Sequence, residues 1–145
     1  MKRFRVTIAM LLAVLLIAGM PVSVVAKEWN AKNSDDVENA FATDTDAEVV
    51  INLENDIKMD RNTVLDAKEN QKYTINGNGN TIADVNLQGS GDVVIEADVE
   101  SNRNVNALYT DGEVTVTVNG SITSSNGGVA ANGDSSVTVT GDVTA

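Results

Sequence analysis

Apolar and polar residues follow two different patterns along this chain. Residues 6–20 (VTIAMLLAVLLIAGM) are almost uninterruptedly apolar, which is typical of a segment that enters a membrane or a secretion pathway. From residue 47 onward, short runs of Val, Ile and Leu instead alternate with polar residues and are separated by Gly, Asn and Asp. Such alternation indicates half-buried β-strands, and the Gly- and Asn-rich breaks indicate tight turns. The chain therefore divides into an apolar leader and a long β-rich region.

The β-rich region repeats itself toward its C-terminal end. Residues 104–124 (NVNALYTDGEVTVTVNGSITS) align without a gap on residues 125–145 (SNGGVAANGDSSVTVTGDVTA), at a constant offset of 21 positions. Looser matches lie upstream: residues 93–99 align with residues 116–122 at an offset of 23, and Ile51 aligns with Ile75 at 24. The pairs at the offset of 21 are Leu108/Val129, Gly112/Gly133, Val116/Val137, Thr117/Thr138, Val118/Val139, Gly120/Gly141, Ile122/Val143 and Thr123/Thr144.

A period of 21–24 residues has a direct structural interpretation. Three short strands joined by tight turns use about that many residues and return the chain to its starting point, about 4.8 Å further along an axis. Val, Ile and Leu then stack inside on their own kind, while Gly and Asn form the corners. We therefore predict an all-β fold, a right-handed parallel β-helix with coils of about 21–24 residues. A β-sandwich is the alternative, because short Val/Thr strands with Gly turns fit it too.

The first 26 residues are predicted to be a signal peptide. Lys2, Arg3 and Arg5 give a basic start, the apolar run follows, and residues 24–26 (VVA) place small residues at a cleavage site. We expect the exported protein to begin at Lys27. An uncleaved membrane anchor is the alternative, because no charged residue lies between Arg5 and Lys27.

Residues 27–46 are predicted to cap the β-helix, whose coils occupy residues 47–145. Val37, Ala40 and Phe41 have helical spacing, and Asp35 could serve as the N-cap with Glu38 three residues on. A helix of about two turns is too short to stand alone, so its apolar face must cover the first coil.

Composition and charge exclude several classes of function. The formal net charge is −11, from 10 basic and 21 acidic residues, and removal of residues 1–26 would take away three basic residues and leave −14. A surface this acidic repels nucleic acid and anionic lipid, so neither is expected as a partner beyond the leader's own membrane contact. The chain has no Cys and no His, which excludes disulfides, Cys-His and Ser-His catalysis and ordinary zinc sites.

Two clusters could suggest polar chemistry, and both have a simpler explanation. Residues 76–80 (NGNGN) resemble half of a Gly-rich calcium repeat, but the motif occurs once, so a tight corner is favoured. The acid pairs Asp35/Asp36 and Asp44/Asp46 could suggest acid–base catalysis, which needs two carboxylates facing each other across a cleft. They lie beside the expected capping helix, and acids are expected at a helix N-terminus for electrostatic reasons. No catalytic, cofactor-binding or metal-binding residue is predicted.

Threonines alternate with valines near the C-terminus. Thr115, Thr117, Thr138 and Thr140 should share the outward face of two stacked strands, with Thr117 under Thr138. Flat threonine arrays occur in ice-binding solenoids, although solvent-facing threonine also simply favours strand formation.

The segment with the expected helix, followed by AEVVINLENDI (47–57) and YTINGNGNTI (73–82), resembles the opening of pectate-lyase-like parallel β-helix proteins. The resemblance covers residues 35–145. That family includes polysaccharide lyases and hydrolases alongside adhesin-like surface proteins. Its enzymes carry clustered Asp ligands for Ca²⁺ or paired acids, with an Arg or Lys base in the lyases. We find no matching constellation, so the resemblance transfers no catalytic residue.

The sequence thus predicts a secreted or cell-surface β-solenoid that acts as a non-catalytic structural, adhesion or glycan-interaction module. An extracellular glycan or a surface protein is the expected partner, and residues 27–145 should not cleave glycans. The alternatives are the N-terminal part of a carbohydrate-active β-helix enzyme and an ice-binding solenoid. Because residues 137–145 (VTVTGDVTA) stop within the repeat, we expect further coils, a closing partner or end-to-end self-association.

Overall fold

The computed structural model describes residues 25–145, so nearly all of the predicted signal peptide lies outside the described residues. These residues form one helix and short strands on either side of it in the sequence. No helix among them is long and apolar enough to cross a bilayer. The elements are β1 (Lys27–Ala31), α2 (Ser34–Thr43), β2 (Glu48–Leu53), β3 (Ile57–Lys58), β4 (Leu65–Ala67), β5 (Lys72–Asn76), β6 (Ile82–Ala83), β7 (Val85–Gly89), β8 (Asp92–Glu96), β9 (Val99–Ser101), β10 (Leu108–Gly112), β11 (Thr115–Val118), β12 (Ile122–Ser124), β13 (Val129–Ala131), β14 (Ser136–Val139) and β15 (Val143–Thr144).

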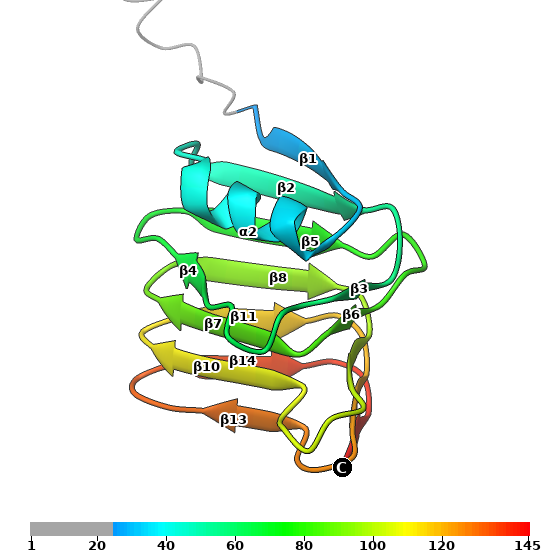
Figure 1. The fold of residues 1–145 in the computed structure, drawn as a ribbon. Helices are drawn as coiled ribbons and strands as arrows, with labels where there is room; N and C mark the ends of the chain where they lie inside the picture. The colour runs from blue at the N-terminus through cyan, green and yellow to red at the C-terminus, as the bar shows by residue number, and fades with distance from the viewer. Residues whose placement is uncertain (1–24) are drawn as a thin grey trace, which may run out of the picture.

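The strands stack along one axis in three parallel sheets (Figure 1). The six-stranded sheet has the order β1-β2-β5-β8-β11-β14, the four-stranded sheet β4-β7-β10-β13 and the five-stranded sheet β3-β6-β9-β12-β15. A full coil gives one strand to each sheet before the chain moves on by one strand spacing. The predicted parallel β-helix is therefore confirmed, and the β-sandwich is excluded because its strands would pair antiparallel.

Strand register confirms the repeat that the sequence predicted. Val118 pairs with Val139 at the offset of 21, Val116 with Val93 at 23, and Ile51 with Ile75 at 24. One coil is shorter than the predicted range, because Ile75 pairs with Ile95 at an offset of 20. The short coil has only one residue between β6 and β7, where the neighbouring coils have six.

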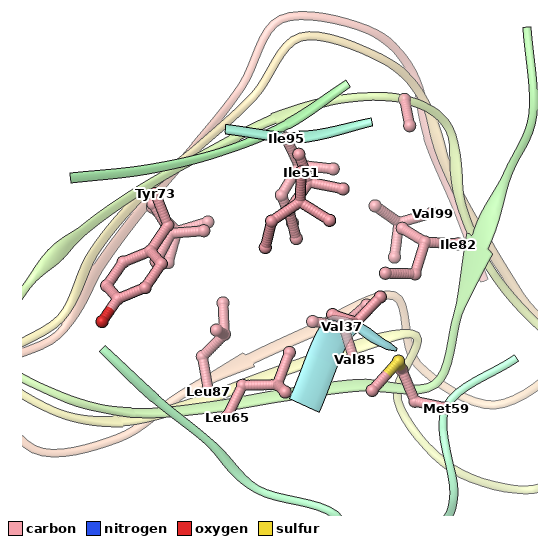
Figure 2. Packing of buried hydrophobic residues seen from close by; sticks show 14 of the residues in the cluster. Val37, Ile51, Met59, Leu65, Tyr73, Ile82, Val85, Leu87, Ile95 and Val99 are labelled. Atoms are coloured by element: carbon pink, nitrogen blue, oxygen red, sulfur yellow. The ribbon is translucent and has the colours of Figure 1, made fainter. Parts of the chain in front are cut away.

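The interior consists of columns of aliphatic side chains, one column for each inward position of a strand. Ile51, Ile75, Ile95 and Val118 are register neighbours in the six-stranded sheet and are fully buried. Each such side chain contributes roughly 1.5–3 kcal/mol through burial, and only because another coil lies above and below it. Figure 2 shows the columns facing one another across the interior. Ile51 and Ile95 belong to the six-stranded sheet, Leu65 and Leu87 to the four-stranded sheet, and Ile82 and Val99 to the five-stranded sheet.

Helix α2 covers the first coil, as predicted, with Val37, Ala40 and Phe41 buried beneath it. Phe41 stacks on Tyr73 with a ring-centroid distance of 4.1 Å and an interplanar angle of 5°. Burial raises the pKa of the Tyr73 hydroxyl above its ordinary value of 10.0. The helix therefore covers the apolar columns at this end, and the stacked rings of Phe41 and Tyr73 are part of that cover.

The predicted N-cap was wrong by two residues. Asn33, in extended conformation, is the N-cap, and its Oδ1 accepts a hydrogen bond from the Asp36 N–H at 3.1 Å. Asp36 in turn accepts from the Lys32 N–H at 2.8 Å. Asn and Asp cap equally well, so the choice depends on where the chain leaves the preceding strand. Asp35 lies inside the first turn.

Strand β1 was not predicted, because the segment before the helix had been interpreted only as part of the cap. It pairs with β2 and starts the six-stranded sheet. Trp29 of β1 lies half-buried over the core, and its indole Nε1 donates a hydrogen bond to Asp44 Oδ2 at 2.7 Å. The first coil is thus covered by both a strand and a helix.

Glycines occupy one corner of successive coils because no other residue fits there. Gly89 and Gly112 are register neighbours, and Gly112 has a φ of +91°. A Cβ on Gly112 would lie 2.7 Å from the Gly89 carbonyl oxygen, too close for real atoms. Gly133 stacks on Gly112 in the same way in the last coil. The Gly112/Gly133 match in the sequence therefore reflects a backbone requirement.

Acidic side chains on the outside are spaced along the axis. Asp66, Gln88 and Asp111 are successive register neighbours, so an amide separates two carboxylates. Likewise, Lys72 lies between Glu48 and Asp92. At another corner, the carboxylate of Asp56 accepts from the Thr81 N–H at 2.8 Å and that of Asp98 from the Ser121 N–H at 2.7 Å. No acid pairs with another acid at any paired strand position within residues 25–145.

Burial decreases toward the last coil. Val116 and Val118 are fully buried, whereas their partners Val137 and Val139 are half-buried. Val143 pairs with Ile122, yet its exposed fraction is 53% against 0%. The inward residues of β14 and β15 have a neighbouring coil on one side only.

Candidate functional site

A surface cavity lies at the corner between the five-stranded and four-stranded sheets. Three successive coils turn this corner with segments of different length: residues 59–64, then Asp84 alone, then residues 102–107. The short turn lies between two longer loops, which leaves a notch above it. We call this cavity the Asp84 notch. Its volume is about 340 Å³, and its lining residues are Arg61, Asp84, Val85, Asn86, Arg103, Asn104, Val105, Asn106, Tyr109 and Asn126.

Asp84 makes the one-residue turn possible. Its φ of +58° lies in the left-handed region, which Asp and Asn tolerate better than other residues with a side chain. Its N–H donates to the Glu100 carbonyl at 3.0 Å, and the next N–H, of Val85, donates to the Ala107 carbonyl at 2.9 Å. These two bonds keep β6 and β7 in register with the coil below, so the intervening loop 102–107 has to bulge outward.

The Asp84 carboxylate is buried at the bottom of the notch. Its side chain is only 4% exposed. Oδ1 accepts a hydrogen bond from the Ser101 hydroxyl at 2.6 Å, and Oδ2 lies 3.2 Å from Nε of Arg103. This ionic contact lacks hydrogen-bond geometry, so Oδ2 is buried without a hydrogen-bond partner among the described residues. Buried carboxylate oxygens are nearly always hydrogen-bonded, and the charged group next to this oxygen is the Arg103 guanidinium, so the Asp84 carboxylate holds that side chain in place.

Serines from the next coil fix the lower loop of the notch. The Ser125 hydroxyl donates to the Arg103 carbonyl at 2.9 Å, and the Ser124 hydroxyl donates to the Val105 carbonyl at 3.0 Å. Arg103 is therefore held by its backbone as well as by Asp84. A loop of this kind presents its side chains in a defined arrangement without support from a helix.

One wall of the notch comes from the four-stranded sheet. Asn86 and Tyr109 are register neighbours on β7 and β10, with their side chains on the outer face. The Tyr109 hydroxyl accepts a hydrogen bond from Asn132 Nδ2 at 2.7 Å, which holds the ring against the sheet. The wall thus offers an amide and an aromatic ring next to the buried carboxylate.

The NGNGN motif forms a tight corner, as predicted. A Cβ at Gly77 would lie 2.6 Å from the Asn80 carbonyl oxygen, and Asn78 and Gly79 both have positive φ. Asn80 Nδ2 donates to the carbonyls of Gly77 and Leu53, each at 3.1 Å. These amides serve the backbone of the corner.

The acid pairs serve the cap, and neither pair faces the other across a cavity. Asp36 lies in the first turn of α2 and accepts a hydrogen bond from the Lys32 N–H, and buried Asp44 is the C-cap. Burial opposes ionisation of Asp44, but hydrogen bonds from Asp46 N–H and the Trp29 indole, together with the Lys27 charge, outweigh it and lower the pKa of Asp44 below 3.8. Asp44 therefore stabilises the cap in its charged form.

Thr115, Thr117 and Thr138 lie on the outer face of the six-stranded sheet, as predicted, and Thr117 pairs with Thr138. Thr140, in contrast, follows β14, and its hydroxyl donates to the Val118 carbonyl at 3.3 Å. The two-threonine pattern does not extend across the sheet. The equivalent positions on β8 are Asp92 and Val94. The threonine surface therefore spans two strands and is interrupted by a carboxylate.

Within residues 25–145, no group of three or more acidic side chains is placed to hold a metal ion. Comparison of the chain with protein-family models, with curated proteins and with solved structures gave no match. What the structure shows of the expected likeness to pectate-lyase-like proteins is the parallel β-helix.

None of the candidate residues from the sequence lies in the Asp84 notch. Asp84 stands alone between Ala83 and Val85, and the arginines stand alone in polar loops, so no motif marks them. A usable signal existed in the spacing, because the coil that contains Asp84 is the short one. Alignment of the upstream coils would have placed residues 61, 84 and 103 at one corner.

Proposed function

We propose that this protein is an exported, non-catalytic β-solenoid that binds glycans in the Asp84 notch. The observation that carries the proposal is a cavity of about 340 Å³ in which the buried Asp84 carboxylate holds Arg103 by its Nε. The Nη groups of Arg103 are left to donate to sugar hydroxyl oxygens, and a charged donor makes the stronger kind of hydrogen bond.

The other lining residues support the same ligand class. Asn86, Asn104, Asn106 and Asn126 each offer an amide that can donate to or accept from hydroxyl groups. Tyr109 offers an aromatic ring, against which the C–H face of a sugar can pack. A volume of about 340 Å³ lies within the usual range for small-ligand sites. A polyhydroxylated ring with one apolar face matches this combination.

Binding without cleavage is proposed because the notch is lined by one carboxylate only. Glycoside hydrolysis by the usual route needs two, one on each side of the scissile bond. The predicted signal peptide and the acidic composition support export, which would bring the notch into contact with extracellular polysaccharide.

A glycan array with residues 27–145 tests the proposal. We expect at least one glycan class to bind without release of reducing or unsaturated ends. Tyr109→Ala should weaken that binding about fivefold or more, since it removes one wall of the notch. Thr138→Ala, on the outer face of another sheet, is the control and should leave binding unchanged. Absence of binding to any glycan, or equal losses for the two variants at equal thermal stability, would contradict the proposal.

A further inference from the structure

All arginines of the described chain line the same cavity. Residues 25–145 contain two, Arg61 and Arg103, and both border the Asp84 notch from neighbouring loops. The remaining basic residues of this part are lysines, none of which lines the notch. The two guanidinium groups lie on opposite sides of the coil that contains Asp84, because residue 61 belongs to the coil above it and residue 103 to the coil below.

The notch is a positive site on an otherwise acidic molecule. Its charged lining residues are Arg61, Arg103 and Asp84, which sum to +1, and its other lining residues are neutral. The segment after residue 26, in contrast, has 7 basic and 21 acidic residues. The nearest acid in sequence to Arg61, Asp60, accepts a hydrogen bond from the Asn62 N–H at 3.3 Å and serves its own turn.

The two arginines differ in whether another side chain holds them in place. Arg103 is oriented by Asp84, which faces its Nε, so the donors on its two Nη atoms are left for a ligand. Arg61 is exposed and has neither a hydrogen-bond nor an ion-pair partner among residues 25–145. One guanidinium is thus preorganised and the other is free to close on a bound group. Guanidinium groups make paired hydrogen bonds to carboxylate, sulfate and phosphate oxygens that lysine cannot reproduce.

We propose that the notch selects glycans that carry an oxyanion. The anionic substituent is held by Arg61 and the Nη groups of Arg103, and the sugar ring lies against Tyr109 and the asparagine amides of the lining. The Asp84 carboxylate is buried behind Arg103 and is therefore kept away from the ligand's negative charge. The inference rests on the proposed glycan-binding function and adds the charge class of the ligand.

The test compares charged and neutral forms of the same backbone. Binding of residues 27–145 is measured by calorimetry for two pairs of ligands. One pair is an oligoglucuronate and its carboxyl-reduced neutral counterpart, and the other is a neutral oligosaccharide with and without sulfate groups. We expect one or both anionic forms to bind at least about tenfold more tightly than their neutral counterparts, with an affinity that falls as salt is added. The arm that binds identifies carboxylate or sulfate as the preferred group.

Variants of Arg61 assign the effect to the notch. Arg61→Gln should lower affinity for the anionic glycan about tenfold and leave that for the neutral form unchanged. Arg61→Lys should give an affinity for the anionic glycan between those of the wild type and of Arg61→Gln. Lys58→Gln, an equal charge change on the same coil outside the notch, is the control and should have little effect. Since Arg61 is exposed and makes no hydrogen bond or ion pair within residues 25–145, these variants should keep the wild-type melting temperature.

The outcomes separate the two proposals. Equal binding of charged and neutral forms, insensitive to Arg61→Gln, would overturn the oxyanion inference and leave glycan binding in place. Binding of inorganic phosphate or sulfate that Arg61→Gln abolishes, with no glycan bound, would keep the oxyanion site and overturn the glycan function. If neither glycans nor inorganic anions bind, both proposals are wrong.

Discussion

The first and last coils of the described residues both place aliphatic side chains inward but bury them to different extents. At the N-terminal end, β1 and α2 cover the first coil, and Phe41 lies face to face with Tyr73. At the C-terminal end, Val137 and Val139 repeat Val116 and Val118 in register but remain half-buried. Position in the stack, and not residue type, therefore decides how much each valine contributes. A coil is stabilised by the coils on both sides of it.

The largest effect should come from a charge placed in a covered column. Val118→Asp buries an unpaired carboxylate and should lower the free energy of unfolding by about 4 kcal/mol. Val139→Asp, the same change one coil later, should cost less than half as much because water reaches that position. Thr117→Asp, on the outer face of the same strand as Val118, is the control. Urea denaturation measures all three, and equal losses at residues 118 and 139 would show that both ends are equally covered.

At the glycine corner, too, a substitution in a covered coil should cost more stability than the same substitution in the last described coil, although both losses should be smaller. Gly112→Ala puts a methyl group against the Gly89 carbonyl and forces alanine to a positive φ, at a cost of about 2 kcal/mol. Gly133→Ala meets an equally close contact with Gly112, but the last coil can shift to relieve it. We therefore expect about half the loss in thermal denaturation. A larger loss at residue 133 would indicate that the last coil is the more rigid of the two.

The smallest effect should come from pH, and only at the covered end. Because the pKa of Asp44 is lowered by folding, its contribution is fully present above the unfolded value of about 3.9 and is lost as pH falls through the lower folded value. Asp44→Asn should cost about 1 kcal/mol near pH 7 and reduce the loss of stability below pH 4. Trp29, the one tryptophan, reports on this contact by fluorescence. Asp142→Asn, in the last coil, should leave both the stability and the acid dependence nearly unchanged.

The sequence predicted the architecture because residues that pair in neighbouring coils of a β-helix are separated by a nearly constant number of positions in the sequence. The alignment of Val116 on Val137 is the same statement as their pairing in β11 and β14. Upstream, the offsets vary from 20 to 24 in the six-stranded sheet and from 17 to 25 in the five-stranded sheet, since loops of different length are inserted at the corners. Those insertions weaken the repeat in the sequence, and they also create the Asp84 notch. The candidate site was therefore hidden by the same irregularity that forms it.

The alternation of acids with neutral or basic residues along the axis has a consequence for electrostatic self-energy. Two carboxylates separated by one intervening strand, such as Asp66 and Asp111, lie about 9.6 Å apart along the stack, since each strand spacing is about 4.8 Å. This distance is close to the Debye length of about 8–10 Å at physiological ionic strength. Each carboxylate is therefore largely screened from the next, and the molecule can carry a high negative charge at little cost in stability. Dilution into low salt lengthens the screening distance beyond that spacing, so repulsion should then act along the entire stack at once.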